Sequence, residues 1–188
     1  MKMFKYYLLL FCTLLFFPYS NAMANEEAPY DIVDKNNVYE IRKYSDRLAV
    51  ETTTSGSNNN FRKLFNYISG GNQSSEKISM TTPVTQVEKN GSMSMQFYLP
   101  SKFNSSNAPK PTREDVSLIT IEGGYYAVLR FSGRASDKNF TKHMEILKNE
   151  LQNNNILITS PPIRATYDSP FTLPMNRRNE AMFKVKLN

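Results

Sequence analysis

Two segments of the chain repeat apolar residues with the period of an α-helix. In residues 58–69 the apolar positions fall at i, i+3, i+4 and i+7, on one helix face, and Gly70-Gly71 follows as a stop signal. Residues 136–152 contain a second stripe, with Ser136 or Asp137 available as the N-cap. The pattern therefore predicts two amphipathic helices. Their stripes are Phe61, Leu64, Phe65 and Ile68, and Phe140, Met144, Leu147 and Leu151.

Much of the remaining chain alternates apolar with polar residues or is rich in β-branched and aromatic side chains, which is typical of β-strands. Turn residues separate consecutive segments at Lys89-Asn90-Gly91-Ser92 and at Glu122-Gly123-Gly124. The predicted strands are residues 38–44, 48–54, 92–99, 116–121, 125–131 and 181–187, with residues 83–87 and 163–167 as further candidates.

The predicted elements occur in the same order twice: two strands, a helix and two strands. The sequence LAVETTTSGS leads into the first helix much as YAVLRFSGRAS leads into the second. We therefore predict an α+β fold with an internal ββαββ repeat, in which two helices pack on a distorted antiparallel β-barrel or curved sheet. Residues 100–115, rich in Ser, Asn and Pro, are expected to form a surface connection between the halves.

The first residues have the pattern of a secretory signal peptide. Lys2 and Lys5 precede a short apolar run, and Ala22-Met23-Ala24 has the small residues of a cleavage site. The apolar run is shorter than the ~20 residues of a membrane span. We expect cleavage after Ala24, with Ala22 as the second choice, so that residues 25–188 form one exported domain, periplasmic or secreted. An uncleaved membrane anchor is the alternative.

Composition narrows the range of functions. The formal net charge is +6, and removal of the two leader lysines would leave about +4. Lysine and arginine are scattered among acidic residues, so the concentrated basic face of a nucleic-acid-binding protein is not expected. The single cysteine, Cys12, lies in the leader. The mature chain would therefore have no disulfide, thiol nucleophile or thiolate metal site. Because the apolar run of the leader would be removed, we also expect no integral membrane span in the mature chain.

The candidate catalytic residues do not form a recognisable constellation. His143 is the only histidine, and no G-x-S-x-G elbow accompanies it. The methionines suit packing or a pocket wall better than iron ligation, which needs a second strong ligand. We therefore expect a binding protein and no catalysis. The alternative is an enzyme that acts on a small molecule through Asp168, His143 or Tyr167.

Arg177 and Arg178, which precede the last predicted strand, allow two interpretations. Paired arginines can hold carboxylates such as porphyrin propionates in a bidentate manner. Alternatively, the arginines and nearby Glu180 bond locally and fix the end of the strand. The many tyrosines are similarly ambiguous, because they suit both the rim of a pocket for a flat ligand and a half-buried sheet.

Several motifs, in order and over nearly all of residues 30–185, resemble those of the SOUL family of haem-binding proteins. They are YEIRKY, FRKLFNYISGGN followed by EKISMTTPV, FYLPSKF with PKPTREDV, YAVLRFSG, and YDSPFTLPMNRRNEAMFKV. The resemblance implies a distorted barrel with two helices, in agreement with the predicted repeat. It also implies reversible, non-covalent binding of haem or another tetrapyrrole, and the leader favours an exported bacterial member.

The resemblance further implies where the ligand lies. In the family, the ring is thought to occupy a shallow apolar groove along the first helix, with basic side chains near the propionates. Lys43 stands where one branch of the family has a histidine proposed to bind iron, so we expect a weakly coordinated b-type haem or another porphyrin. Carried onto this chain, the binding residues are Arg62, Lys63, Phe65, Asn66, Tyr67 and Met80.

One alternative is a general module of the cell envelope that binds hydrophobic small molecules. The implied fold also resembles the effector-binding domains of bacterial regulators. No DNA-binding segment accompanies it in this sequence, so a small molecule, and not nucleic acid, is the expected partner. The oligomeric state stays open.

Overall fold

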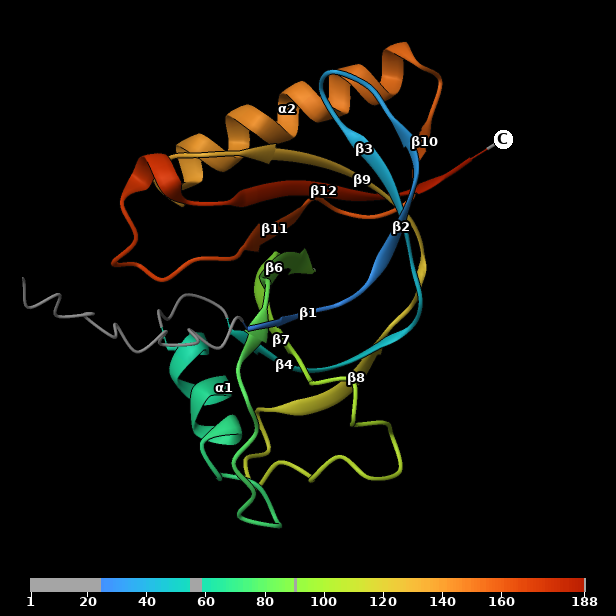
Figure 1. Cartoon of the computed structure of the whole chain (residues 1–188). Coiled ribbons are helices and arrows are strands. Elements are labelled where there is room, and N and C mark those ends of the chain that lie inside the picture. The colour runs from blue at the N-terminus through green and yellow to red at the C-terminus, as the bar shows by residue number, and fades with distance from the viewer. Residues whose placement is uncertain (1–24, 55–58, 90, 188) are drawn as a thin grey trace, which may run out of the picture.

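The computed structural model describes residues 25–54, 59–89 and 91–187. Within them, ten strands form one curled antiparallel sheet, and two helices, α1 (Asn60–Ile68) and α2 (Asp137–Asn153), pack outside the curl (Figure 1). The predicted α+β class and curved sheet are thus confirmed. The sheet contains β2 (Tyr30–Lys35), β3 (Glu40–Tyr44), β4 (Arg47–Thr54), β6 (Val84–Lys89), β7 (Ser92–Tyr98), β8 (Ser117–Ile121), β9 (Gly124–Phe131), β10 (Leu157–Ile158), β11 (Ile163–Thr166) and β12 (Asn179–Lys186).

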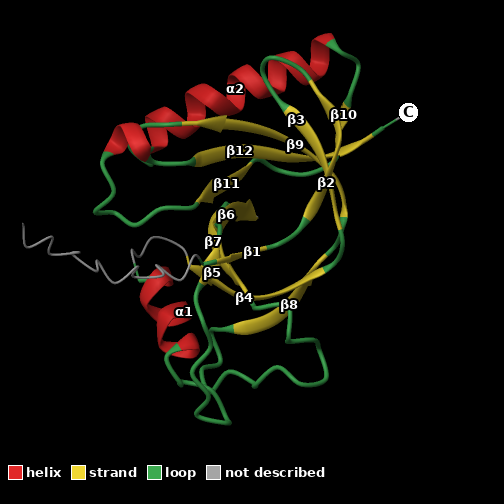
Figure 2. Cartoon of the chain, in the orientation of Figure 1, coloured by secondary structure: helices red, strands yellow, loops and turns green. Residues whose placement is uncertain are grey.

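The strand order explains how the two repeats fit together. Along the sheet it is β2-β3-β9-β12-β11-β6-β7-β4-β8, with β10 paired to β12 (Figure 2). The two repeats meet at the β11–β6 pair, near the middle of this order. On either side of it, β3 of the first half pairs with β9 of the second, and β8 of the second half pairs with β4 of the first. Each repeat therefore completes the sheet of the other with its first strand.

Helix α2 covers the second half of the sheet as its sequence pattern predicts. All four residues of its stripe are buried, and they pack in one cluster with side chains of β3, β9 and β12. The Ser136 hydroxyl caps the helix by accepting from the backbone N–H of Asn139. The stripe and the cap signal together located this helix correctly.

Helix α1 is shorter and is buried on a different face from the one expected. Leu64 and Ile68 of the predicted stripe reach the core, together with Tyr67. Phe61 and Phe65, in contrast, stay about half exposed. Gly70, at φ +107°, follows the helix in the left-handed region, as the predicted stop signal requires.

Four short or exposed strands escape the sequence pattern. β2 is an edge strand with five exposed residues, so it has no apolar alternation to detect. β10 has two residues, and so do β1 (Glu26–Glu27) and β5 (Thr81–Thr82), which pair with each other in parallel. A 3₁₀ turn, η1 (Pro174–Asn176), precedes β12. β6 and β7 pair across the predicted hairpin turn, whose Asn90 lies outside the described residues.

The connection over residues 100–115 runs largely over the surface, as expected from its composition. The predicted leader, residues 1–24, lies outside the described residues. In the part of the chain that the structure describes, no helix has the length and apolar character needed to cross a membrane.

Candidate functional site

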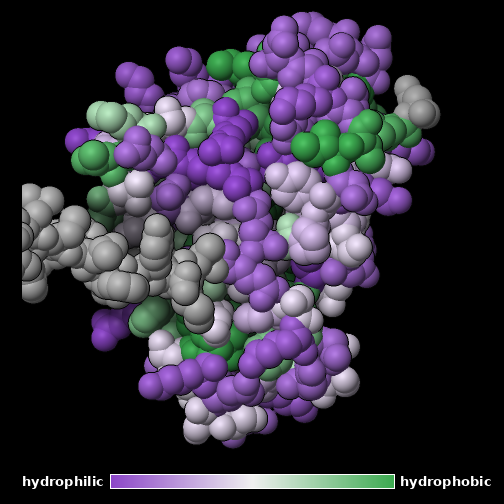
Figure 3. Space-filling model, viewed as in Figure 1, coloured by the Kyte–Doolittle hydropathy of each residue, from purple (hydrophilic) through white to green (hydrophobic). Residues whose placement is uncertain are grey.

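The outward side of α1 presents two aromatic side chains. Phe61 and Phe65, one helical turn apart, are 47% and 51% exposed. Their rings are nearly parallel, with centroids 6.0 Å apart and an interplanar angle of 13°. Phe61 also meets the buried Phe97 of β7 edge to face at 5.1 Å. The pair forms an apolar surface that is anchored to the core, and Figure 3 shows apolar surface in the region of α1.

The polar side chains of α1 differ in their availability to a ligand. Arg62 and Asn66 are exposed. Lys63 is mostly covered, and its Nζ lies 3.0 Å from Oδ2 of Asp115. Hydrogen bonds from Arg113 and then from Lys63 hold the pKa of the Asp115 carboxyl well below its usual range. Arg62 is therefore the α1 cation that remains open to a propionate, whereas the charge of Lys63 is paired.

Tyr67 and Met80 lie against the core beneath α1. Tyr67 is 1% exposed, and its hydroxyl donates to the carbonyl oxygen of Pro109 at 2.8 Å. Burial, reinforced by Glu76, raises the pKa of Tyr67 to about 12. Met80 is half-buried beside the cluster that holds α1. Of the six residues that the resemblance implies, three are exposed on α1: Arg62, Phe65 and Asn66.

The side of the sheet opposite the helices carries a buried charge network centred on Glu180 of β12. Glu180 is fully buried and accepts hydrogen bonds from both terminal nitrogens of Arg42, at 3.0 and 3.2 Å. Nε of Arg178, at 2.9 Å, and the hydroxyl of Tyr167, at 2.6 Å, also donate to it. Burial, then the charge of Glu180, raises the pKa of Tyr167 far above its usual range. The carboxylate is thus already saturated with protein donors.

Of the two interpretations of Arg177 and Arg178, the structure shows local bonding. Arg178 forms a bidentate pair with Glu27 of β1, with both N–O distances 2.8 Å. Arg177 donates to the backbone carbonyl oxygens of Thr172 and Pro170. Both guanidinium groups therefore tie the end of β12 to neighbouring segments.

The candidate catalytic residues are engaged in contacts of the fold. Nδ1 of His143 lies 2.7 Å from the carbonyl oxygen of Asn139, and its ring stacks on Phe131 at 3.9 Å. Asp168 accepts a hydrogen bond from the backbone N–H of Arg178 at 2.5 Å. Within the described residues, no group of three or more His, Cys, Asp or Glu side chains is placed to hold a metal ion.

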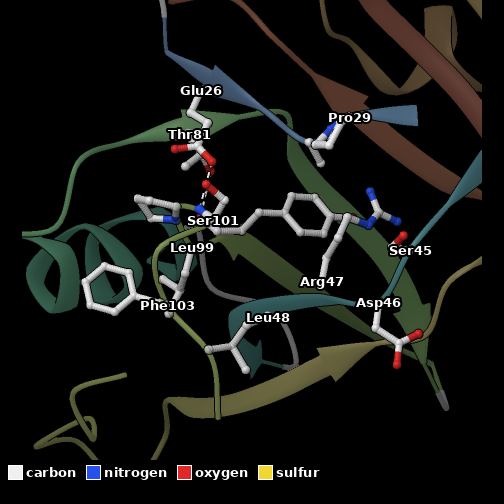
Figure 4. A pocket seen from close by; sticks show the side chains of 13 residues that line it. Glu26, Pro29, Ser45, Asp46, Arg47, Leu48, Thr81, Leu99, Ser101 and Phe103 are labelled. Atoms are coloured by element: carbon white, nitrogen blue, oxygen red, sulfur yellow. Dashed lines mark hydrogen bonds between the residues drawn. The ribbon is translucent and has the colours of Figure 1, made fainter. Parts of the chain in front are cut away.

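A cavity of about 220 Å³ opens where β4 begins and β7 ends. In Figure 4, Leu48, Leu99 and Phe103 lie on one side of it, and Arg47 extends along the other. A more open hollow of about 390 Å³ shares Arg47 and Tyr98 with this cavity. The structure therefore contains two distinct concave regions near one arginine, apart from the exposed surface of α1.

Comparison with known proteins assigns the chain to a family. The family model described as "SOUL heme-binding protein" matches residues 25–184. The chain belongs to the SOUL family. It is also 30% identical to Heme-binding protein 2 of Mus musculus over 172 residues, which cover 84% of this chain and 83% of that protein. Heme-binding protein 2 of Homo sapiens is 29% identical over 168 residues, with coverage of 82% and 81%.

Solved structures share the fold of this SOUL protein at low sequence identity. The C-terminal domain of EcmrR has a TM-score of 0.60 and 12% identity, and the match covers 85% of this chain and 99% of that one. A structure described as a hydrolase from Listeria innocua has a TM-score of 0.57 and 9% identity, with coverage of 82% and 94%. These similarities concern the architecture alone.

Sequence reasoning missed Phe61 and Arg47 as candidate site residues. Phe61 follows the helical period, which predicts burial, whereas its side chain is 47% exposed in the structure. Arg47 opens β4 between a polar turn and an apolar run, where nothing in the local pattern distinguishes it from other surface cations. The helical period carries no signal that separates Phe61 from the buried residues of α1.

Proposed function

We propose that this SOUL protein binds haem or another tetrapyrrole non-covalently on the exposed side of α1. The observation that carries the proposal is the stacked, half-exposed pair Phe61 and Phe65. Contiguous apolar surface that stays exposed on a folded protein marks a candidate site for a ligand or a partner. The family and the curated relatives named for haem binding point to the same class of ligand.

The size of the aromatic surface is consistent with reversible binding. Covering both half-exposed rings would remove on the order of 150 Å² of apolar surface from water, which contributes about 4 kcal/mol. A micromolar Kd corresponds to about 8 kcal/mol. Further contacts of the macrocycle and the pairing of a propionate with Arg62 would supply the remainder.

The residues near α1 fit the ring better than they fit the iron. His143 lies on α2 and stacks on Phe131, and Met80 packs against the core. We therefore propose a b-type haem with weak coordination, in which the apolar ring face provides most of the affinity. Haem would supply its own redox chemistry when bound, while the protein holds and carries it without a catalytic step.

We propose in addition that the protein acts outside the cytoplasm, in the periplasm or after secretion. The support is the leader pattern in residues 1–24, with its basic start, apolar run and small residues before Asn25. Mass spectrometry of the N-terminus of the exported protein should find Asn25 as the first residue. A full-length chain that retains Met1 in the membrane fraction would contradict this proposal.

The binding proposal is tested by titrating hemin into residues 25–188 and following the Soret band. Wild type should show a saturable shift at micromolar hemin. Phe61→Ala/Phe65→Ala should weaken binding at least tenfold, because the ring loses its apolar support. The matched control is Leu157→Ala, which removes another exposed apolar side chain, from β10, and should leave the Kd unchanged.

Two outcomes of this titration would overturn the proposal. One is the absence of a saturable shift for wild type, and the other is an equal Kd for wild type and the double variant. Metal-free protoporphyrin, followed by fluorescence, should bind within a few-fold of hemin because the ring provides the affinity. If unrelated hydrophobic dyes compete equally well, the protein is the general hydrophobic-ligand module instead.

A further inference from the structure

Arg47, at the start of β4, lies among three tyrosine rings. Its guanidinium lies over the rings of Tyr44 and Tyr98, with Cζ 4.2 and 4.6 Å from the ring centroids, and near the ring of Tyr126, at 5.5 Å. Tyrosine faces attract a cation but do not neutralise its charge or accept its in-plane hydrogen bonds. The cage therefore fixes the orientation of the guanidinium without supplying a negative charge.

The hydrogen bonding of Arg47 is incomplete. Its Nε is buried and has no hydrogen-bond partner among the described residues. No carboxylate of those residues lies within salt-bridge distance of it, whereas Arg42 and Arg178 are both paired with Glu180. Because buried N–H donors are almost always satisfied, the unpaired Nε indicates a missing acceptor. A carboxylate suits this guanidinium, since it carries the opposite charge and can accept from two N–H groups together.

Arg47 also lies at a cavity. It lines both the cavity of about 220 Å³ and the more open hollow of about 390 Å³. Apolar side chains of Leu48, Leu99 and Phe103 form part of the wall of the smaller cavity (Figure 4). An apolar chamber that ends at a fixed cation is suited to an amphipathic anion.

The acidic residues of the same cavity do not neutralise Arg47. Glu26 accepts a hydrogen bond from the backbone N–H of Ser101 at 2.7 Å. Asp46 accepts one from the backbone N–H of Gly123, also at 2.7 Å. In Figure 4 both carboxylates are directed away from the guanidinium. Neither carboxylate that lines the cavity therefore serves as a counter-ion for the guanidinium of Arg47.

We infer that Arg47 anchors a second ligand site, which takes a small amphipathic carboxylic acid with its apolar body in the 220 Å³ cavity and its carboxylate on the guanidinium. The cavity is smaller than the ~300–1,000 Å³ of pockets for drug-sized ligands, so the ligand is a short-chain or single-ring acid and not a macrocycle. The cavity lining includes no residue of α1. The site is therefore separate from the proposed tetrapyrrole surface and does not depend on it.

The test uses octanoate as the probe and ¹⁵N-labelled residues 25–188 followed by NMR. Octanoate should bind saturably and shift the Arg47 Nε–H resonance together with the amides of Leu48 and Leu99. Octan-1-ol, which has the same apolar chain but no charge, should bind at least tenfold more weakly. Since both ligands are applied to wild type, this comparison does not require any variant to fold.

Variants then separate this site from the α1 surface. Arg47→Gln should raise the Kd for octanoate at least tenfold and leave the Kd for hemin unchanged. The octanoate Kd of Arg47→Lys should lie between those of wild type and Arg47→Gln, because lysine keeps the charge but cannot donate two parallel hydrogen bonds. Phe61→Ala/Phe65→Ala should leave octanoate binding unchanged. Equal affinity for octanoate and octan-1-ol, or octanoate shifts confined to α1, would overturn the inference.

Discussion

At the scale of single residues, the best-defined feature is Glu180, a fully buried carboxylate. Its two oxygens accept from Arg42, Arg178 and Tyr167, so the cost of removing the charge from water is offset by four charge-assisted hydrogen bonds. The two arginines keep further partners, since Arg42 also contacts Glu40 and Arg178 also contacts Glu27. Such a network is costly to break from its centre.

Glu180→Gln should therefore destabilise the protein by about 3 kcal/mol, the lower end of the range for breaking a buried pair, because the two arginines retain their outer carboxylates. Urea unfolding measures the loss. Glu122→Gln is the control, since Glu122 pairs with Lys184 but its side chain is 83% exposed. It should cost less than about 1 kcal/mol. Equal costs for the two variants would show that the buried network contributes no more than a surface ion pair.

The pairing of Arg42 with Glu180 could not be predicted from the sequence. Arg42 and Glu180 are 138 positions apart, and their pairing depends on β3 and β12 both flanking β9. Neither residue has a local signature of burial. The burial of Tyr67 also has no local signature, because Tyr67 lies next to the predicted apolar stripe of α1 and not within it. Residues that meet across the sheet cannot be read from local periodicity.

At the scale of elements, the two helices are held in different ways. α2 has 17 residues, a side-chain cap and an acidic residue in its first turn. α1 has nine residues, no side-chain cap hydrogen bond and no acidic residue in its first turn. Isolated helices shorter than ~12–15 residues are marginal in water, so α1 depends on its core contacts and on the loop that follows it.

Asn72 organises that loop, and its replacement should loosen α1. Its Nδ2 donates to the carbonyl oxygens of Tyr67 and Glu76, and its Oδ1 accepts from the N–H groups of Ser74 and Glu76. Asn72→Ala should cost about 2–3 kcal/mol, because these buried backbone groups lose their partner. It should also speed hydrogen exchange over residues 67–78.

The control for Asn72 is Asn154→Ala at the end of α2. Asn154 is exposed and donates to the carbonyl oxygen of Glu150 at 2.7 Å. Its removal should cost less than about 1 kcal/mol and leave exchange in α1 unchanged. If Asn72→Ala leaves exchange over residues 67–78 at the wild-type rate, the loop does not hold the helix.

Element prediction worked where burial follows a simple period. Both helices, the repeat and the central strands were located because one of their faces packs against a core. β2 was missed because it is an edge strand whose residues are mostly exposed, and β1, β5 and β10 because two residues are too few for any pattern. The placement of the ligand on α1 stays a prediction, and the distinction between exposed and buried residues of that helix required the packed structure.

At the scale of the whole molecule, buried tyrosines should make the fold sensitive to alkali. Burial raises the pKa of Tyr44, and of Tyr67, to about 12. The unfolded value is about 10, so the folded state holds these protons more tightly. Their contribution is complete below pH ~10 and is lost as the pH rises toward about 12, by at most about 1.4 kcal/mol per pH unit for each tyrosine.

Urea unfolding between pH 9 and 12 measures this loss. Tyr67→Phe should reduce the slope above pH ~10, although it lowers stability at neutral pH by about 1 kcal/mol through the lost hydrogen bond to Pro109. Leu157→Ala, which removes an exposed side chain without an ionisable group, is the control and should keep the wild-type slope. A stability that stays constant from pH 10 to 12 would contradict the assignment.

The exchange of β3 and β8 between the repeats means that the two halves are interlocked. A protease cut within residues 100–115 would leave two fragments, each lacking a strand that only the other can supply, β8 for the first and β3 for the second. The cut molecule would then behave as an obligate heterodimer, and its stability would depend on protein concentration. The surface connection thus makes folding a reaction of one molecule, because it keeps the two interlocked halves in the same chain.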